Sequence, residues 1–220
     1  MGAVAGLFAL MTEQHGVASC RQARRAGVSL SVERRLLREG AVVELLPGVL
    51  AAGGVRPGYA ALAMAASLRP GVVAVSHGTA ARLHGLAGFE RYDRLDVLGR
   101  KGCRLRLVPP VITHYSRGET SGHVVRVGSI PVTSLALTLT LLAPACGAEA
   151  LALALGAALA KGVTRDEIRG VAAAWQEHGR PGPGTLLSLL DRYPPISSSA
   201  ADQGSISPAT TAAVRAAQRS

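Results

Sequence analysis

Three arginines close together near the start of the chain offer the clearest chemistry in this sequence. Arg34, Arg35 and Arg38 follow Ser29 at spacings that place them on or near one side of a helix. A guanidinium group is a planar fork that pairs with phosphate oxygens or with O6 and N7 of guanine. A helix that carries such groups outward can lie in the major groove of DNA. The spacing therefore predicts that this segment binds double-stranded DNA.

The candidate interface includes polar residues near these arginines. Ser31 falls near the start of the same helix, where backbone N–H groups and the positive end of the helix dipole attract phosphate. The full candidate set is Arg21, Arg24, Ser29, Ser31, Arg34, Arg35 and Arg38. A merely solvated helix face is the alternative. The sequence also leaves open which arginine meets a base and which meets a phosphate.

The overall charge agrees with a polyanionic partner. The chain of 220 residues has a formal net charge of +10, and all but two of its 24 basic residues are arginine. Such a chain is attracted to nucleic acid or to anionic lipid. A GC-rich coding bias explains the preference for arginine over lysine, but it does not explain the shortage of acids. The excess of positive charge falls almost entirely within residues 1–135.

No complete catalytic or cofactor site is recognisable. A divalent-metal nuclease needs an acidic residue two positions before a lysine, but Gly99 stands there before Lys101. Ser76 lacks the G-x-S-x-G setting of a hydrolase nucleophile. Gly53–Gly54 and Gly182-x-Gly184 lack the preceding strand, the following helix and the lysine of a phosphate-binding loop. We therefore predict no enzymatic activity, no cofactor and no catalytic residue.

The histidines show no spacing typical of metal ligands. His77 and His84 share one face of a helix without a further ligand nearby, so packing or helix capping explains them. His114 and His123 fall on separate strands. Asp96 adjoins basic residues and is predicted to be a solvated charge at a strand end. We predict no metal site.

Periodicity predicts three helices and a hairpin in the first 54 residues. Apolar residues at helical spacing predict a helix over residues 3–14, and two shorter helices follow with Ser19 and Ser29 as N-caps. Two apolar runs around Pro47 and Gly48 predict a β-hairpin over residues 41–52. This order of elements predicts a winged helix-turn-helix over residues 1–54.

A linker over residues 53–58 leads into a predicted mixed α/β domain over residues 59–193 with a helical C-terminal part. Helices are predicted over 59–68, 76–84, 133–142, 148–160, 164–177 and 184–191, and strands over 72–75, 95–98, 111–115 and 124–127. The whole chain is therefore predicted to be of the α+β class.

The Ser- and Ala-rich residues 194–220 predict a disordered tail. The basic segment 100–106 is equally consistent with a second phosphate-binding surface and with an exposed hairpin.

One apolar run raises the question of a membrane. From Thr133 to Ala160 the run is broken by Pro144 and Gly147, and the pieces are shorter than the roughly 20 residues that a span needs. Two Ala/Leu helices in a soluble core are predicted, and a membrane hairpin is the alternative.

The three cysteines are odd in number and far apart, which predicts free thiols in a reducing cytosol. We predict a cytoplasmic protein without membrane contact.

Three motifs in order resemble a known family. The first is Gly27–Ser29 with the arginine-rich helix and Leu46–Leu50, the second is Ser76–Ala81 with Leu83–Leu86, and the third is Ile130–Leu139. Together they resemble the AbiEi-type antitoxins of type IV toxin–antitoxin systems, in particular actinobacterial members. The resemblance covers roughly residues 5–193.

The resemblance implies a cytoplasmic bacterial repressor of its own operon that opposes a toxin of the nucleotidyltransferase type. Leu137 stands where an arginine is usual in that family. Many relatives also carry an endonuclease-like domain beyond about residue 190, where this chain has its Ser- and Ala-rich tail, so nuclease activity is not carried over. A protein–protein module and a truncated member of the endonuclease-domain family are the alternative functions.

Overall fold

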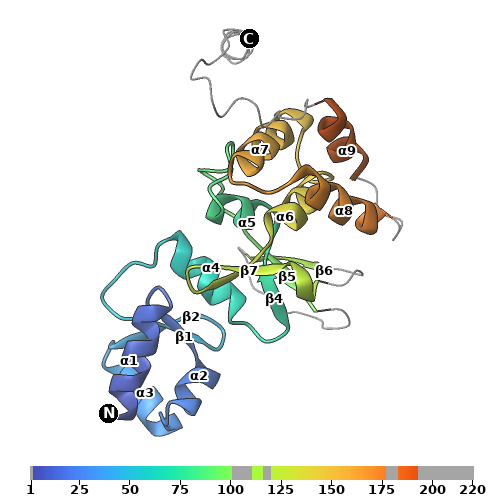
Figure 1. The fold of residues 1–220 in the computed structure, drawn as a ribbon. Coiled ribbons are helices and arrows are strands. Elements are labelled where there is room, and N and C mark those ends of the chain that lie inside the picture. Colours follow the sequence, from blue (N-terminus) through green and yellow to red (C-terminus); the bar gives the residue numbers. More distant parts are fainter. Residues whose placement is uncertain (1, 101–110, 116–119, 177–182, 193–220) are drawn as a thin grey trace, which may run out of the picture. The chain divides into compact units, whose positions relative to one another are not determined.

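The computed structural model describes residues 2–100, 111–115, 120–176 and 183–192 (Figure 1). The chain divides into a compact unit of residues 1–190 and a second unit of residues 191–220. The described part of the first unit contains two β-sheets with helices before, between and after their strands, which confirms the α+β class. The predicted tail, 194–220, and residues 101–106 of the basic segment lie outside the described residues.

Residues 3–52 fold around a small apolar core of their own. The elements are α1 (Ala3–Glu13), β1 (Val17–Ser19), α2 (Cys20–Arg25), α3 (Leu30–Arg38), β2 (Val42–Leu46) and β3 (Val49–Ala52). The strands form an antiparallel sheet in the order β1-β3-β2. Leu7 and Met11 of α1 meet Leu36 of α3 and Leu50 of β3 in the core. The expected helices and hairpin are present, whereas β1 was not predicted because three buried residues are too few to show a period.

The predicted N-caps Ser19 and Ser29 are confirmed, whereas Ser76, predicted to cap the helix over residues 76–84, makes no side-chain cap hydrogen bond. Ser29 Oγ accepts a hydrogen bond from Val32 N at 3.3 Å at the start of α3. Ser19 Oγ accepts from Gln22 N at 3.2 Å, while the Gln22 side chain accepts from Ser19 N at 2.8 Å. This reciprocal pair is a capping box, which satisfies N–H groups that the first turn of a helix leaves unpaired. The starts of α2 and α3 are thereby fixed.

The second sheet has five strands in the order β6-β5-β4-β8-β7. They are β4 (Val72–Val75), β5 (Leu95–Gly99), β6 (Val111–Tyr115), β7 (Val124–Val127) and β8 (Ile130–Thr133). The pairs β4–β8 and β5–β6 are parallel, whereas β4–β5 and β7–β8 are antiparallel. The helix predicted to start at residue 133 is preceded by the unpredicted strand β8 and starts later, as α6 (Leu135–Leu142) with Ser134 as its N-cap. A buried strand and a buried helix have similar apolar composition, so the sequence pattern does not show where β8 ends and α6 begins.

Two strand–helix units lie side by side in this sheet. β4 leads into α5 (His77–Leu83) and β8 leads into α6, and the two strands pair through Val75 and Val132. His84 Nε2 donates a hydrogen bond to the Thr133 carbonyl oxygen at 2.7 Å and joins the two units. Burial lowers the pKa of His84 despite this hydrogen bond, because the charged imidazolium would lose its hydration.

The helical C-terminal part shares one buried cluster with α6. It contains α7 (Ala148–Ala160), α8 (Arg165–Gln176) and α9 (Pro183–Arg192), whose buried side chains include Leu151, Leu155, Ile168 and Leu186. The two Ala/Leu helices predicted between residues 133 and 160 are confirmed as α6 and α7. Over the ranges that the structure describes, a helix with the length and hydropathy to span a bilayer is not found.

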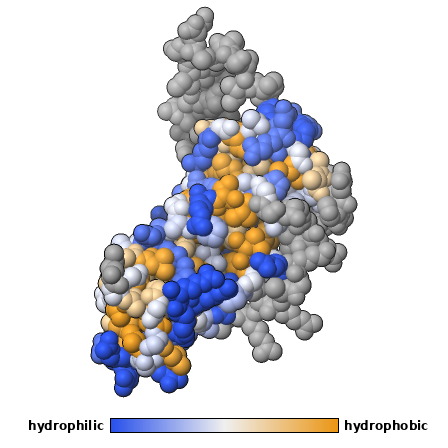
Figure 2. Space-filling model, turned by 60° about the horizontal axis from the view of Figure 1, so that its bottom comes forward, coloured by the Kyte–Doolittle hydropathy of each residue, from blue (hydrophilic) through white to orange (hydrophobic). Residues whose placement is uncertain are grey.

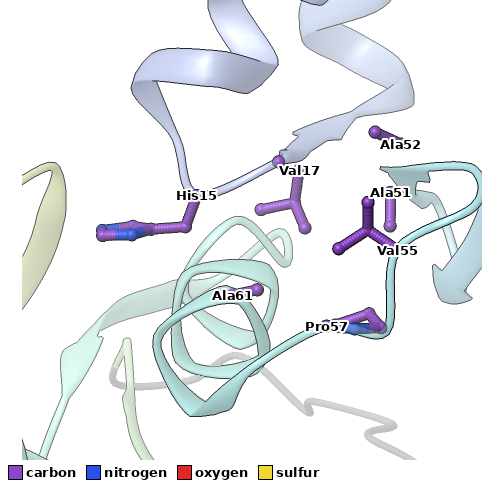
Figure 3. A pocket seen from close by; sticks show the side chains of 8 residues that line it. His15, Val17, Ala51, Ala52, Val55, Pro57 and Ala61 are labelled. Carbon is purple, nitrogen blue, oxygen red and sulfur yellow. The ribbon is translucent and has the colours of Figure 1, made fainter.

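The helix α4 (Tyr59–Ser67) packs against both sheets. Ala61 and Ala65 belong to one buried cluster with Val17 and Ala51 of the small sheet and Val75 of the larger one. A hollow of about 120 Å³ remains between α4 and the small sheet, and its walls are mostly small and apolar (Figure 3). Residues 3–52 thus have a core of their own and share a second one with the elements that follow.

The structure corrects the prediction for Asp96. This residue of β5 is 2% exposed and is not a solvated charge. Its carboxylate accepts hydrogen bonds from His114 of β6 and from Tyr92. The error arose because one of these partners lies on another strand, so local sequence does not reveal the burial.

Gly53 is expected to tolerate no side chain. A Cβ at this position would lie 1.8 Å from the carbonyl oxygen of Gly40, and Gly53 N already donates to the Ala41 carbonyl at 2.9 Å. Gly53→Ala should therefore push the end of β3 away from the α3–β2 turn. We expect the free energy of unfolding to fall by about 1–3 kcal/mol, the usual cost of overpacking, in chemical denaturation followed by circular dichroism.

Gly156→Ala is the matched control. Gly156 lies within α7, and a Cβ there meets no atom within 4 Å. Because alanine is the better helix former, this change should raise the free energy of unfolding by about 0.5–1 kcal/mol. Similar losses in both variants would contradict the close approach at Gly53.

Acid is expected to destabilise the fold through His84. The folded state lowers the pKa of His84, so its contribution to stability is present above the ordinary histidine pKa and is lost as the pH falls below it. The free energy of unfolding should decrease between about pH 7 and pH 5. The decrease should be smaller in His84→Gln, whose amide still donates, and unaltered in a His15→Gln control. Parallel pH curves for both variants and the parent protein would contradict this role.

Candidate nucleic-acid interface

The outward face of α3 carries four of the candidate residues. Ser31, Arg34, Arg35 and Arg38 recur at helical spacing, and all four are exposed. The opposite face of the helix holds Leu36, which is buried in the N-terminal core. Since a helix repeats every 3.6 residues, burial of one face turns the other toward solvent. A shallow hollow runs along this outward face between Ser31 and Arg38.

The surface around α1–α3 is mixed in polarity. Figure 2, in which the bottom of the molecule comes forward, shows strongly hydrophilic side chains at this end beside hydrophobic ones. Leu30, the first residue of α3, is 46% exposed although it is apolar. Base edges in the major groove offer both polar atoms and the thymine methyl group. The face therefore has chemistry for both kinds of contact.

The arginines of α3 differ in their partners. Arg35 Nε lies 3.8 Å from Glu39 Oε1, and both side chains are more than half exposed. Such a pair is loose and contributes little to stability. Among the described residues, no carboxylate forms an ion pair with Arg34 or Arg38. These two guanidinium groups are the most available to an incoming phosphate or base.

Arg24 has a structural partner that sequence analysis missed. Its Nη1 donates to Oε2 of Glu33, a residue of α3 whose side chain is only 9% exposed. The ion pair ties α2 to α3 and offsets the cost of burying a carboxylate. The sequence could have predicted this partner, because Glu33 falls on the apolar side of the helix with Val32 and Leu36. A carboxylate on a buried apolar face requires a partner.

Of the remaining candidates, Ser29 caps a helix and Arg21 is exposed on another. Ser29 is occupied as the N-cap of α3, and its hydroxyl lies 2.9 Å from that of Ser31. Arg21 of α2 is exposed. The candidate set therefore contains exposed cations on both helices, whereas Ser29 and Arg24 also maintain the arrangement of α2 and α3.

The β2–β3 turn supports α2. Gly48 adopts a φ of +76° in this turn, and its carbonyl oxygen accepts a hydrogen bond from Cys20 N at 2.9 Å. The Glu44 side chain accepts from Gly48 N at 2.8 Å and holds the turn from the other side. The hairpin is thus attached to the start of α2.

Other kinds of site are less well supported. In the part of the chain that the structure describes, no three His, Cys, Asp or Glu side chains are grouped so that they could hold a metal ion. Burial raises the pKa of the Cys20 and Cys146 thiols, which disfavours the reactive thiolate.

The second and third sequence motifs meet inside the fold. Thr79, Ala80 and Ala81 of α5 are buried, as are Leu137 and Thr138 of α6. These residues belong to the adjacent units β4–α5 and β8–α6. Both motifs therefore carry side chains that pack the interior.

Comparisons with known proteins give no family. No protein-family profile matches the chain, and no curated protein matches its sequence. The structure is distantly similar to that of the RV2827C protein from Mycobacterium tuberculosis, known from a crystal structure. The two chains are 16% identical, the match covers 88% of this chain and 83% of the other, and the TM-score is 0.44.

The ion pair between α2 and α3 is expected to stabilise the N-terminal elements. Glu33→Gln keeps the shape of the side chain but removes its charge, and it should lower the free energy of unfolding by about 1–2 kcal/mol. Glu39→Gln is the matched control, because the exposed Arg35–Glu39 pair should contribute less than about 0.5 kcal/mol. Equal effects of the two substitutions in thermal and chemical denaturation would show that the buried pair does not hold the helices together.

Proposed function

We propose that residues 1–54 are a winged helix-turn-helix that binds double-stranded DNA, with α3 in the major groove. The order α1-β1-α2-α3-β2-β3 supports this, because a second helix followed by an exposed third helix and a hairpin suits groove binding. The observation that carries the proposal is the outward face of α3. There Arg34 and Arg38 are exposed, and among the described residues no acid pairs with either.

The proposed roles follow from the partners of each residue. Arg34 and Arg38 contact bases or phosphates directly, because a guanidinium without an acidic partner gives up no ion pair on binding. Arg35 exchanges its loose contact with Glu39 for a phosphate. Arg24 remains with Glu33 and sets the angle between α2 and α3. Binding of this kind releases counterions, so affinity should fall steeply with salt.

Arg34→Ala and Arg38→Ala test the proposal on a duplex that covers the region upstream of the protein's own gene. Each substitution should weaken binding by about 1–3 kcal/mol where it removes a paired base contact. A substitution that removes only a phosphate contact should weaken all duplexes alike and reduce the salt slope by about one. Fluorescence anisotropy at several salt concentrations measures both effects.

Two further variants sharpen the experiment. Arg91→Ala removes an exposed arginine from the loop that precedes β5 and should leave DNA affinity nearly unchanged. Glu39→Gln removes the acid beside Arg35 and should strengthen binding. Wild-type affinity in the Arg34→Ala, Arg38→Ala double variant would overturn the assignment of α3 to the groove.

The regulatory part of the proposal rests on the sequence motifs. We propose that the protein represses its own operon from the cytoplasm and opposes a toxin of the nucleotidyltransferase type, as the resemblance to AbiEi-type antitoxins implies. The competing proposal is a protein–protein module in which residues 59–193 bind the toxin without DNA. Co-purification with the product of a neighbouring nucleotidyltransferase gene, compared between the parent protein and the arginine variants, distinguishes the two proposals. Capture of the toxin that does not change in the variants would favour the protein–protein module. Loss of repression in those variants, with capture of the toxin retained, would support both activities in one chain.

A further inference from the structure

A second polar site lies far from α3 in the sequence. A cavity of about 300 Å³ is bounded by β5, β6, the start of α5 and the loop between α6 and α7. His114, Tyr92 and Arg94 contribute polar groups to its lining, and Phe89, Ile112 and Leu142 contribute apolar ones. Cavities of this size that combine apolar walls with a few convergent polar groups are typical of small-molecule sites.

A buried carboxylate organises the polar wall. Asp96 Oδ1 accepts from His114 Nε2 at 2.8 Å, and Asp96 Oδ2 accepts from the Tyr92 hydroxyl. Burial by itself would raise the pKa of Asp96, but the hydrogen bonds from His114 and Tyr92 outweigh it and hold that pKa below its usual value. Burial and the nearby carboxylate also raise the pKa of Tyr92, so its phenol keeps its proton.

This arrangement fixes the tautomer of His114. Since an ionised carboxylate only accepts, the proton of the neutral ring lies on Nε2 and a lone pair lies on Nδ1. The side chain is 32% exposed, and no described residue forms a hydrogen bond with Nδ1. His77 stacks on the ring at 3.7 Å between centroids and limits its rotation.

The backbone around the cavity is held in an unusual conformation. His77 adopts a φ of +48°, which is rare for a residue with a side chain. A Cβ on Gly78 would lie 2.3 Å from the Tyr92 ring, so the phenol packs directly on the chain there. Such conformations persist where the surrounding structure fixes them, often at ligand sites.

Two hydrogen bonds hold the backbone of Arg94, one of the residues that line the cavity. Its carbonyl oxygen accepts from the Tyr59 hydroxyl at 2.9 Å and from Thr79 Oγ1 at 3.2 Å. Arg82 in turn lies over the Tyr59 ring and donates to the Tyr92 carbonyl oxygen. The backbone of Arg94 is therefore fixed at the cavity, while the residue is exposed.

The polar groups favour an anion over a metal ion. Both oxygens of Asp96 already accept hydrogen bonds, and Arg94 brings a positive charge to the cavity. An anion next to Nδ1 needs a proton between the two, because two lone pairs repel. A phosphate monoester carries such a proton in about half of its molecules near pH 6, the value of its second pKa, whereas sulfate carries none.

We propose that this cavity binds a phosphate monoester, with the phosphate between His114 Nδ1 and the Arg94 guanidinium and an apolar substituent against Phe89, Ile112 and Leu142. The shared proton comes from the phosphate monoanion. Asp96 and Tyr92 are positioning residues that fix the His114 ring. The site is independent of the proposed DNA interface.

The test uses the full chain without DNA and follows histidine ring signals by NMR at a constant pH of about 6, where a large fraction of a phosphate monoester still carries a proton. Inorganic phosphate should shift the His114 and His77 signals in a saturable way, with a dissociation constant on the order of 1 mM. The signals of the exposed His15 should not shift. Phenyl phosphate should bind about tenfold more tightly, because its ring covers apolar wall. Equal affinity for the two would assign the site to inorganic phosphate alone and overturn the monoester assignment.

Variants and competing ions complete the design. Arg94→Ala and His114→Asn should each weaken phenyl phosphate binding at least about tenfold, whereas Arg91→Ala should not. Saturable shifts with sulfate as strong as those with phosphate would show an adventitious ion only. Saturable shifts with Zn²⁺ but not with phosphate would assign the site to a metal. Either result overturns the proposal, and neither bears on DNA binding by α3.

Discussion

The proposed DNA interface depends on the burial of one face of α3. Leu36 packs into the N-terminal core, and the carboxylate of Glu33 is covered and pairs with Arg24. A buried carboxylate without a partner would cost several kcal/mol, so this contact fixes both the rotation of α3 and its angle to α2. The same rotation turns Arg34 and Arg38 outward. The exposed chemistry of the helix is therefore a consequence of its interior contacts.

The rest of the fold is built from small aliphatic side chains with few aromatic ones. Alanines in α4 allow its backbone to come close to both sheets, and hydroxyls fill places where chains meet, as Thr133 and Thr138 do at 2.7 Å. Two of the three sequence motifs fall in this interior. Their residues specify how β4–α5 and β8–α6 pack. The family resemblance of these two motifs therefore reflects packing of the interior and gives no direct evidence of an activity.

The chain carries two groups of charged residues that differ in environment. The arginines of α3 stand in solvent, where a polyanion can replace loose contacts such as that of Arg35 with Glu39. Asp96 is buried in a network with His114 and Tyr92, where each of its carboxylate oxygens accepts a hydrogen bond. Open groups suit an extended backbone of phosphates, whereas a closed network suits one small ligand held in one orientation.

The sequence by itself determined the elements that local chemistry controls. Apolar periodicity located the helices and most strands, and serine hydroxyls marked the starts of α2 and α3, because capping and amphipathic spacing act within a few residues. The strands β1 and β8, the partner of Arg24 and the burial of Asp96 were decided only by tertiary structure. Each of them depends on contacts between separate segments, such as β1 with β3 or Asp96 with His114. A single sequence read along its length does not register such contacts, because the free energy that fixes them arises when the segments meet.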